Sequence, residues 1–147
     1  MTEQAMSATI EKPVSQSAFT EASIKRVWIG RVLSGLAALF CVMDGGMKLV
    51  RAPLAVQATA QLGYPDSAVV GIGCVLLICT VFYIIPRTAL VGAVLLSGYL
   101  GGAVASKVRV SAPAFDTLFP VAIACLAWAG LYLRDIRLRS WWKPSSN

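Results

Sequence analysis

The chain has 147 residues, of which 57% are apolar and only 14% charged, whereas soluble domains are about 45–50% apolar and about 25% charged. These proportions exclude an ordinary soluble globular domain, and they exclude a largely disordered chain, since disordered chains contain few apolar residues. The net charge of +6 would suit nucleic acid, but the Lys and Arg residues lie at the ends of long apolar runs, as in membrane proteins. We therefore expect a lipid bilayer, and no nucleic acid, as a partner.

Residues 1–26 are polar and rich in Ser, Thr, Glu and Gln, so they offer little that could pack into a core. We interpret them as a disordered cytoplasmic tail. The first apolar run begins only at Val27, which is too late for a cleavable signal peptide. The tail is therefore expected to stay on the protein.

Four apolar segments follow, at 27–43, 68–85, 88–105 and 118–133. Each approaches the roughly 20 residues with which a helix crosses the hydrocarbon of a bilayer. Pro86 and Arg87 separate the second segment from the third, and because proline cannot continue the preceding helix, they indicate a tight turn. The predicted fold is an all-α integral membrane protein, a four-transmembrane-helix antiparallel bundle over 27–142 with a C-terminal tail at 143–147.

The basic residues also predict an orientation. Nine Lys and Arg residues fall on the side of the amino terminus and four on the other side. Positive charge accumulates on the cytoplasmic side of such membranes, so both termini are predicted to be cytoplasmic. Trp28, Tyr83 and Tyr132 fall near the same boundary, where amphipathic rings prefer to lie.

A further helix is predicted between the first two spans. Pro53 suits the first turn of a helix, apolar residues follow up to Leu62, and Gly63 is a natural stop. We expect a short helix that lies in the membrane interface on the outer face.

Several absences bear on chemistry. The chain has no His, the commonest general base and metal ligand, and no glycine-rich nucleotide motif. Its four Cys lie singly, without a Cys-x-x-Cys pair. We therefore expect no catalytic residue, no metal site and no cofactor held by a known motif, which argues against an enzyme. The cysteines are interpreted as small buried apolar residues, and the alternative is a thiol–disulfide site that would rest on Cys41 and Cys74.

Ionisable residues at the outer ends of the spans form the first candidate site. Asp44 and Lys48 lie four residues apart on one helix face, in the favourable order. Lys107 and Arg109 leave the third span on the same side, and with Tyr99 these residues could form an outer polar pocket. The alternative is that Lys48 extends to the headgroups and Asp44 is only its counter-ion.

Two arginines lie on the opposite, cytoplasmic side. Arg31 is four residues inside the first span and Arg87 is at the tip of the turn. Arg31 is interpreted as extending to the interface, with a role inside the bundle as the alternative. Arg87 is a candidate for binding lipid phosphate.

The third span carries small residues in two neighbouring columns. They are Ser97, Gly101 and Ala105 in one column and Gly98, Gly102 and Ser106 in the other. Small residues four apart let helices approach closely in lipid, so this is a candidate helix-packing face, and it leaves a homodimer open. The alternative is a flat ligand, such as a quinone ring or a lipid chain, lying on this smooth face beside Tyr99.

Four short motifs in the right order resemble the DoxX-like group of the DoxX family, small four-span bacterial membrane proteins. They are Gly-x-x-Lys-Leu at 45–49, Leu-Gly-Tyr-Pro at 62–65, Ile-Pro-Arg-Thr-Ala at 85–89 and the run from Gly98 to Arg109. The resemblance covers residues 27 to about 139. Many similar sequences carry His in place of Lys107.

The resemblance implies a bacterial cytoplasmic (inner) membrane protein. Founding members are subunits of quinone-linked oxidoreductases, and others are linked to complexes that handle oxidative stress. We therefore expect an accessory or quinone-interacting subunit of a membrane oxidoreductase complex, without its own catalytic centre, and a quinone is implied as ligand by resemblance only. The alternatives are a small-solute or lipid carrier that uses the outer polar pocket, or a purely structural partner.

Overall fold

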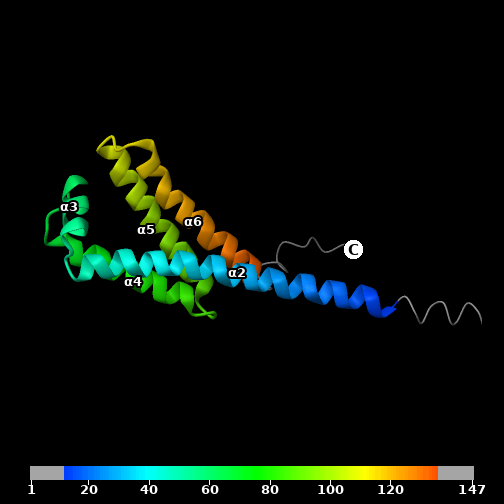
Figure 1. Cartoon of the computed structure of the whole chain (residues 1–147). Coiled ribbons are helices and arrows are strands. Elements are labelled where there is room, and N and C mark those ends of the chain that lie inside the picture. The colour runs from blue at the N-terminus through cyan, green and yellow to red at the C-terminus, as the bar shows by residue number, and fades with distance from the viewer. Residues whose placement is uncertain (1–11, 136–147) are drawn as a thin grey trace, which may run out of the picture.

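The computed structural model describes residues 12–135, and all of the regular structure in this range is helical (Figure 1). The expected stretches at 1–11, 136–142 and 143–147 lie outside the described residues. Five helices follow one another: α2 (Lys12–Leu49), α3 (Pro53–Gln61), α4 (Ala68–Ile84), α5 (Ala89–Arg109) and α6 (Ala114–Arg134). The predicted all-helical fold is therefore confirmed for this part of the chain.

Four of the helices pack into a closed ring. α2 packs against α4 and α6, and α5 packs against the same two helices from the other side. The interior is built from large side chains that are almost completely buried, among them Leu76, Tyr83, Leu96 and Leu131. The outward surfaces are apolar as well, with Ile78, Val94 and Leu118 all more than half exposed. An exterior this apolar needs a lipid or protein covering.

Three helices are long and apolar enough to cross a membrane among the residues described, at Ser23–Leu49, Ala89–Arg109 and Ala114–Arg134. α4 is equally apolar but has only 17 residues. The predicted spans and the helices therefore agree in place, and a membrane protein with several spans is supported.

α2 is longer than the predicted first span. It begins at Lys12, so residues 12–26, which we expected to form a disordered tail, are helical as far as they are described. The reason lies in local preferences: Pro13 is at the first turn, where a missing backbone N–H costs nothing, and Glu21 and Lys25 form an ion pair at 4.0 Å one turn apart. In Figure 1 this part of α2 extends well beyond the other helices.

The connections follow the predicted turn chemistry. α3 has Pro53 in its first turn, and Gly63 after it has a φ of +80°, which favours glycine. Pro86 lies in the short turn between α4 and α5, where the Thr88 Oγ1 donates a hydrogen bond to the Phe82 carbonyl oxygen at 2.9 Å. The predicted short helix and tight turn are both confirmed.

Helix contacts depend on glycines at two crossings. A Cβ at Gly92 of α5 would lie 2.1 Å from the Tyr83 backbone nitrogen of α4, and a Cβ at Gly130 of α6 would lie 2.6 Å from the Ser34 backbone nitrogen of α2. Real side chains do not approach backbone this closely, so only glycine allows these helices to touch. Such contacts are how helices associate in lipid, where hydrophobic burial does not drive them together.

Candidate functional site

The first element of the site is an ion pair on α2. The Lys48 Nζ donates a hydrogen bond to the Asp44 carboxylate one turn earlier, and the Lys48 side chain is only 14% exposed. Gly73 of α4 makes room for it, because a Cβ there would lie 2.8 Å from Lys48 Cβ. This pair is therefore partly enclosed between α2 and α4 and does not extend freely to solvent.

Tyr99 of α5 is the third residue of the site. Its ring packs against the core cluster that contains Cys41 and Cys79, and its hydroxyl lies within electrostatic range of Asp44. No described residue forms a hydrogen bond with that hydroxyl, and its oxygen is not fully enclosed. Asp44 thus interacts with Lys48 and lies near Tyr99, and among the described residues the Tyr99 hydroxyl is the polar group of the three that has no hydrogen bond.

The segment after α3 is tied to the end of α5. The Tyr64 hydroxyl and Ser106 Oγ are hydrogen-bonded at 2.8 Å, and Arg109 donates to the Leu62 carbonyl oxygen at 2.6 Å. The Arg109 guanidinium also lies over the Tyr64 ring, 6.0 Å from its centroid. We name these contacts the α3 latch.

The other two residues of the expected polar pocket have different positions from Asp44 and Lys48. Arg109 is used by the α3 latch, and Lys107 is half-buried with no hydrogen bond or ion pair to a described residue. Arg51 lies 3.9 Å from Asp66, an exposed pair that joins the two ends of the α2–α4 connection. The polar residues at this end therefore form three separate groups, the Asp44–Lys48–Tyr99 site, the α3 latch and the Arg51–Asp66 pair.

Cys41 and Cys74, the alternative thiol–disulfide site, are both free and differ in exposure. Cys74 is exposed, whereas Cys41 is buried. Cys41 instead lies beside Cys79 and Thr80 of α4 in the core. This position suits small apolar residues that fill the interior.

The glycines of the predicted packing face of α5 have no neighbour within the described chain, whereas Ser106 of the same face belongs to the α3 latch. A Cβ at Gly98, Gly101 or Gly102 would have no neighbour within 4 Å, and Ala105 is exposed. Ser97 at its edge accepts a hydrogen bond from the Trp128 Nε1 of α6 at 2.8 Å. Packing of this face would therefore require another molecule, and its role stays a prediction.

Of the two arginines expected at the opposite end, both Arg31 and Arg87 are exposed. The structure adds Arg134, which donates to the Tyr83 carbonyl oxygen at 2.8 Å and lies over the Tyr83 ring at 5.0 Å. Sequence reasoning counted Arg134 only as a cytoplasmic charge. Tyr83 and Ser34 are polar residues inside otherwise apolar segments. They are the feature of the sequence from which a buried polar contact at this end could have been predicted.

Metal binding finds no support among the described side chains. No three His, Cys, Asp or Glu residues in this part of the chain are grouped so that they could hold an ion. The donors that the Asp44–Lys48–Tyr99 site offers are an ammonium and a phenol, which suit an acceptor oxygen of a ligand.

The comparisons with known proteins identify one family. Neither the curated proteins nor the solved structures include a significant match to the chain. A match to the DoxX-like family covers residues 32–130, from the first turns of the apolar part of α2 to Gly130 of α6. This stretch includes the Asp44–Lys48–Tyr99 site, the α3 latch and both glycine crossings, and the chain belongs to the DoxX-like family.

Proposed function

We propose that the chain crosses a bacterial inner membrane four times, with α2, α4, α5 and α6 as spans and both termini in the cytoplasm. The 17 residues of α4 measure about 26 Å at about 1.5 Å each, slightly less than the hydrocarbon thickness. Because α4 packs against α2 and α5, which are both long enough to span, it shares their environment. The excess of Lys and Arg toward the termini supports the orientation.

The site at Asp44, Lys48 and Tyr99 serves, in this proposal, to bind the polar head of a membrane-soluble ligand. The observation that carries the proposal is the Tyr99 hydroxyl, which has no hydrogen-bond partner among the described residues although it lies near Asp44 of a half-buried ion pair. A donor in such a place gains from a ligand that supplies an acceptor oxygen. A quinone carries carbonyl oxygens on an apolar ring, and the quinone-linked oxidoreductases of similar proteins make it the first ligand to test.

The protein would act as an accessory or quinone-interacting subunit of a membrane oxidoreductase complex. Its sequence contains no His and no paired-cysteine motif, so the electrons for a bound quinone would be supplied by a partner protein. Its contribution is then to bind and position the quinone in the membrane.

A small-solute or lipid carrier is the second candidate. The α3 latch favours it, because the latch joins the α3 end to α5 through one hydrogen bond between side chains and one to a carbonyl oxygen. Contacts of this size can break and re-form, as a carrier requires. In this case the Asp44–Lys48–Tyr99 site would hold the cargo.

The first experiment is native mass spectrometry of the protein extracted in mild detergent from its host membrane. A bound quinone or a stable protein partner would support the subunit proposal. A protein that carries only bulk phospholipid would contradict it and would make flux assays in proteoliposomes the next measurement.

The second experiment assigns the ligand to the site. Tyr99→Phe removes the free hydroxyl and should weaken the binding of a short-chain quinone about threefold to tenfold, the worth of one hydrogen bond. Tyr132→Phe, at an exposed tyrosine of α6, is the matched control and should bind normally. Equal affinities of both variants and the unmodified protein would show that the quinone does not use this site.

A further inference from the structure

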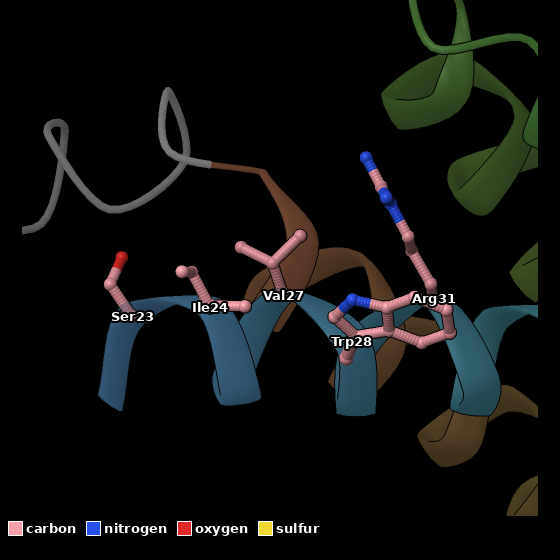
Figure 2. Close-up of a pocket in the computed structure, with 5 residues that line it drawn as sticks. All are labelled: Ser23, Ile24, Val27, Trp28 and Arg31. Carbon is pink, nitrogen blue, oxygen red and sulfur yellow. The ribbon is translucent and has the colours of Figure 1, made fainter. Parts of the chain in front are cut away.

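A shallow groove lies at the end of the bundle opposite α3. It is lined by Ser23, Ile24, Val27, Trp28 and Arg31, all from the N-terminal part of α2 (Figure 2). Its volume of about 250 Å³ is below the roughly 300–1,000 Å³ of sites that enclose drug-sized ligands. The groove therefore suits a group that lies on the surface, and an enclosed ligand would not fit.

The lining residues lie on one face of α2, and along this face they change from small and apolar to aromatic and then to basic. Ser23, Val27 and Arg31 follow one another four residues apart, and Ile24 and Trp28 form the neighbouring column. Figure 2 shows the Arg31 side chain extended away from α2 at one end of the row, with Trp28 beside it. The groove thus offers an apolar floor, an indole ring that is 62% exposed, and a guanidinium.

Only some of the basic residues near this groove are paired within the described part of the chain. Lys25 pairs with Glu21 at 4.0 Å, and Arg134 is held by Tyr83. Arg31 and its neighbour Arg26 are exposed and have no hydrogen bond or ion pair with any described residue. A guanidinium of this kind favours an anion with several oxygens, such as a phosphate.

The position of the groove along α2 indicates that the phosphate belongs to a lipid headgroup. Arg31 and Lys48 are 17 positions apart on one helix, which corresponds to about 26 Å, close to the thickness of the hydrocarbon. With Lys48 at one boundary, Arg31 lies at the other, and Ser23–Trp28 lie among the headgroups. Trp is the residue that prefers this layer.

We propose that this groove binds the headgroup of an anionic phospholipid, with the phosphate on Arg31 and the outer part of the headgroup beside Trp28 and Ile24, so that the acyl chains run along α2 from Arg31 toward Lys48. The site lies outside the family match, which starts at residue 32, and it is independent of the proposed ligand site at the other end of the bundle. Its occupant is a structural lipid that would fix the depth of α2 in the membrane.

Trp28 supplies a direct readout. In a variant in which Trp128, Trp141 and Trp142 are replaced by Phe, Trp28 is the single fluorophore. The variant is placed in vesicles of phosphatidylcholine with increasing fractions of either phosphatidylglycerol or phosphatidylcholine that carries bromine on the acyl carbons next to the glycerol, because bromine quenches only a tryptophan that it contacts. We expect the anionic lipid to quench at about fivefold lower mole fraction, the effect of one basic residue near a membrane surface.

Substitutions then test the role of Arg31. Arg31→Gln should abolish the preference for the anionic lipid, Arg31→Lys should retain part of it, and Arg87→Gln should leave it unchanged, because Arg87 is a basic residue outside the groove. Equal quenching by both lipids in the unsubstituted reporter would overturn the proposal without any Arg31 variant. A preference that survives Arg31→Gln, or that Arg87→Gln removes equally, would also overturn it, since it would then arise from general attraction to the membrane surface.

Discussion

The Tyr83 hydroxyl of α4 donates a hydrogen bond to the Ala127 carbonyl oxygen of α6 at 2.8 Å. The same hydroxyl lies 3.0 Å from Ser34 Oγ of α2, and the Tyr83 residue is completely buried. One side chain therefore joins three helices at the end of the bundle opposite α3. Arg134 closes the arrangement from α6 by donating to the Tyr83 carbonyl oxygen at 2.8 Å.

Tyr83→Phe should destabilise the protein, because the Ala127 carbonyl oxygen loses its side-chain donor and the buried Ser34 hydroxyl loses its hydrogen-bond partner. The expected loss is about 1–3 kcal/mol, the cost of an unsatisfied buried polar group. Thermal unfolding in detergent measures it, with Tyr132→Phe as a control at an exposed tyrosine. An unchanged midpoint for Tyr83→Phe would mean that these hydrogen bonds contribute nothing to stability.

Two glycines of α5 should respond in opposite ways to the same substitution. At Gly92 a new Cβ would lie 2.1 Å from the Tyr83 backbone nitrogen, whereas at Gly98 it would meet nothing within 4 Å. Gly92→Ala should therefore cost at least about 3 kcal/mol or prevent folding. Gly98→Ala should be neutral or stabilising by up to about 1 kcal/mol, because alanine favours a helix. The thermal unfolding midpoints of the two variants, measured under the same conditions, test this difference. Similar losses of stability at both positions would contradict the prediction.

These two glycines also show what sequence patterns can predict. The runs of apolar residues locate α4, α5 and α6 well, because a span must be both long and apolar. The spacing of small residues identified a smooth face at Gly98, Gly101 and Gly102, yet it could not tell which side of α5 faces its neighbours. The close contact between α4 and α5 depends instead on Gly92. This contact arises because the α4–α5 turn brings the two backbones together at that residue, and no spacing of small residues marks it.

Sequence patterns predicted the local contacts of the candidate site but not its contacts between distant helices. Asp44 and Lys48 could be paired from their spacing of four residues, and Tyr99 was placed near them only by its position along the third span. The partners of Arg109 lie 45 to 47 positions earlier in the chain. Contacts at such separations depend on the crossing of whole helices, which no local pattern contains.

Arg109→Gln should loosen the α3 latch. It removes the bond to the Leu62 carbonyl oxygen and the cation over Tyr64, while Tyr64 and Ser106 can still bond. Hydrogen–deuterium exchange should therefore rise several-fold in residues 62–67 and stay constant in α4, because a lost contact to a loop carbonyl lowers its local opening free energy by about 1 kcal/mol or more. Lys107→Gln, at a basic residue two positions earlier on α5 that has no hydrogen bond or ion pair with a described residue, should leave the exchange unchanged. Equal exchange in both variants would show that Arg109 does not hold the segment.

The Asp44–Lys48 pair should be stronger than an exposed ion pair. Exposed pairs on helices contribute about 0.3–0.5 kcal/mol, but Lys48 here is only 14% exposed. A double-mutant cycle with Asp44→Asn and Lys48→Met should give a coupling of about 1–2 kcal/mol that changes little with added salt. The exposed pair of Glu21 and Lys25 provides the comparison, with a smaller coupling that salt reduces. A salt-sensitive coupling below about 0.5 kcal/mol at Asp44–Lys48 would mean that the pair is in contact with bulk water.

The last prediction concerns the four-span topology and tests whether α4 crosses the membrane. If α4 crosses the membrane, the α2–α4 connection and the α5–α6 turn lie on one side, and the two ends of the chain lie on the other. Single cysteines at positions 20, 57, 111 and 146 in a cysteine-free background report this through a membrane-impermeant maleimide added to intact cells. Gln57→Cys and Ser111→Cys should be labelled from outside, and Thr20→Cys and Ser146→Cys only after the membrane is permeabilised. If α4 does not cross, positions 57 and 111 will react from opposite sides, and the three remaining helices would place the two ends of the chain on different sides as well.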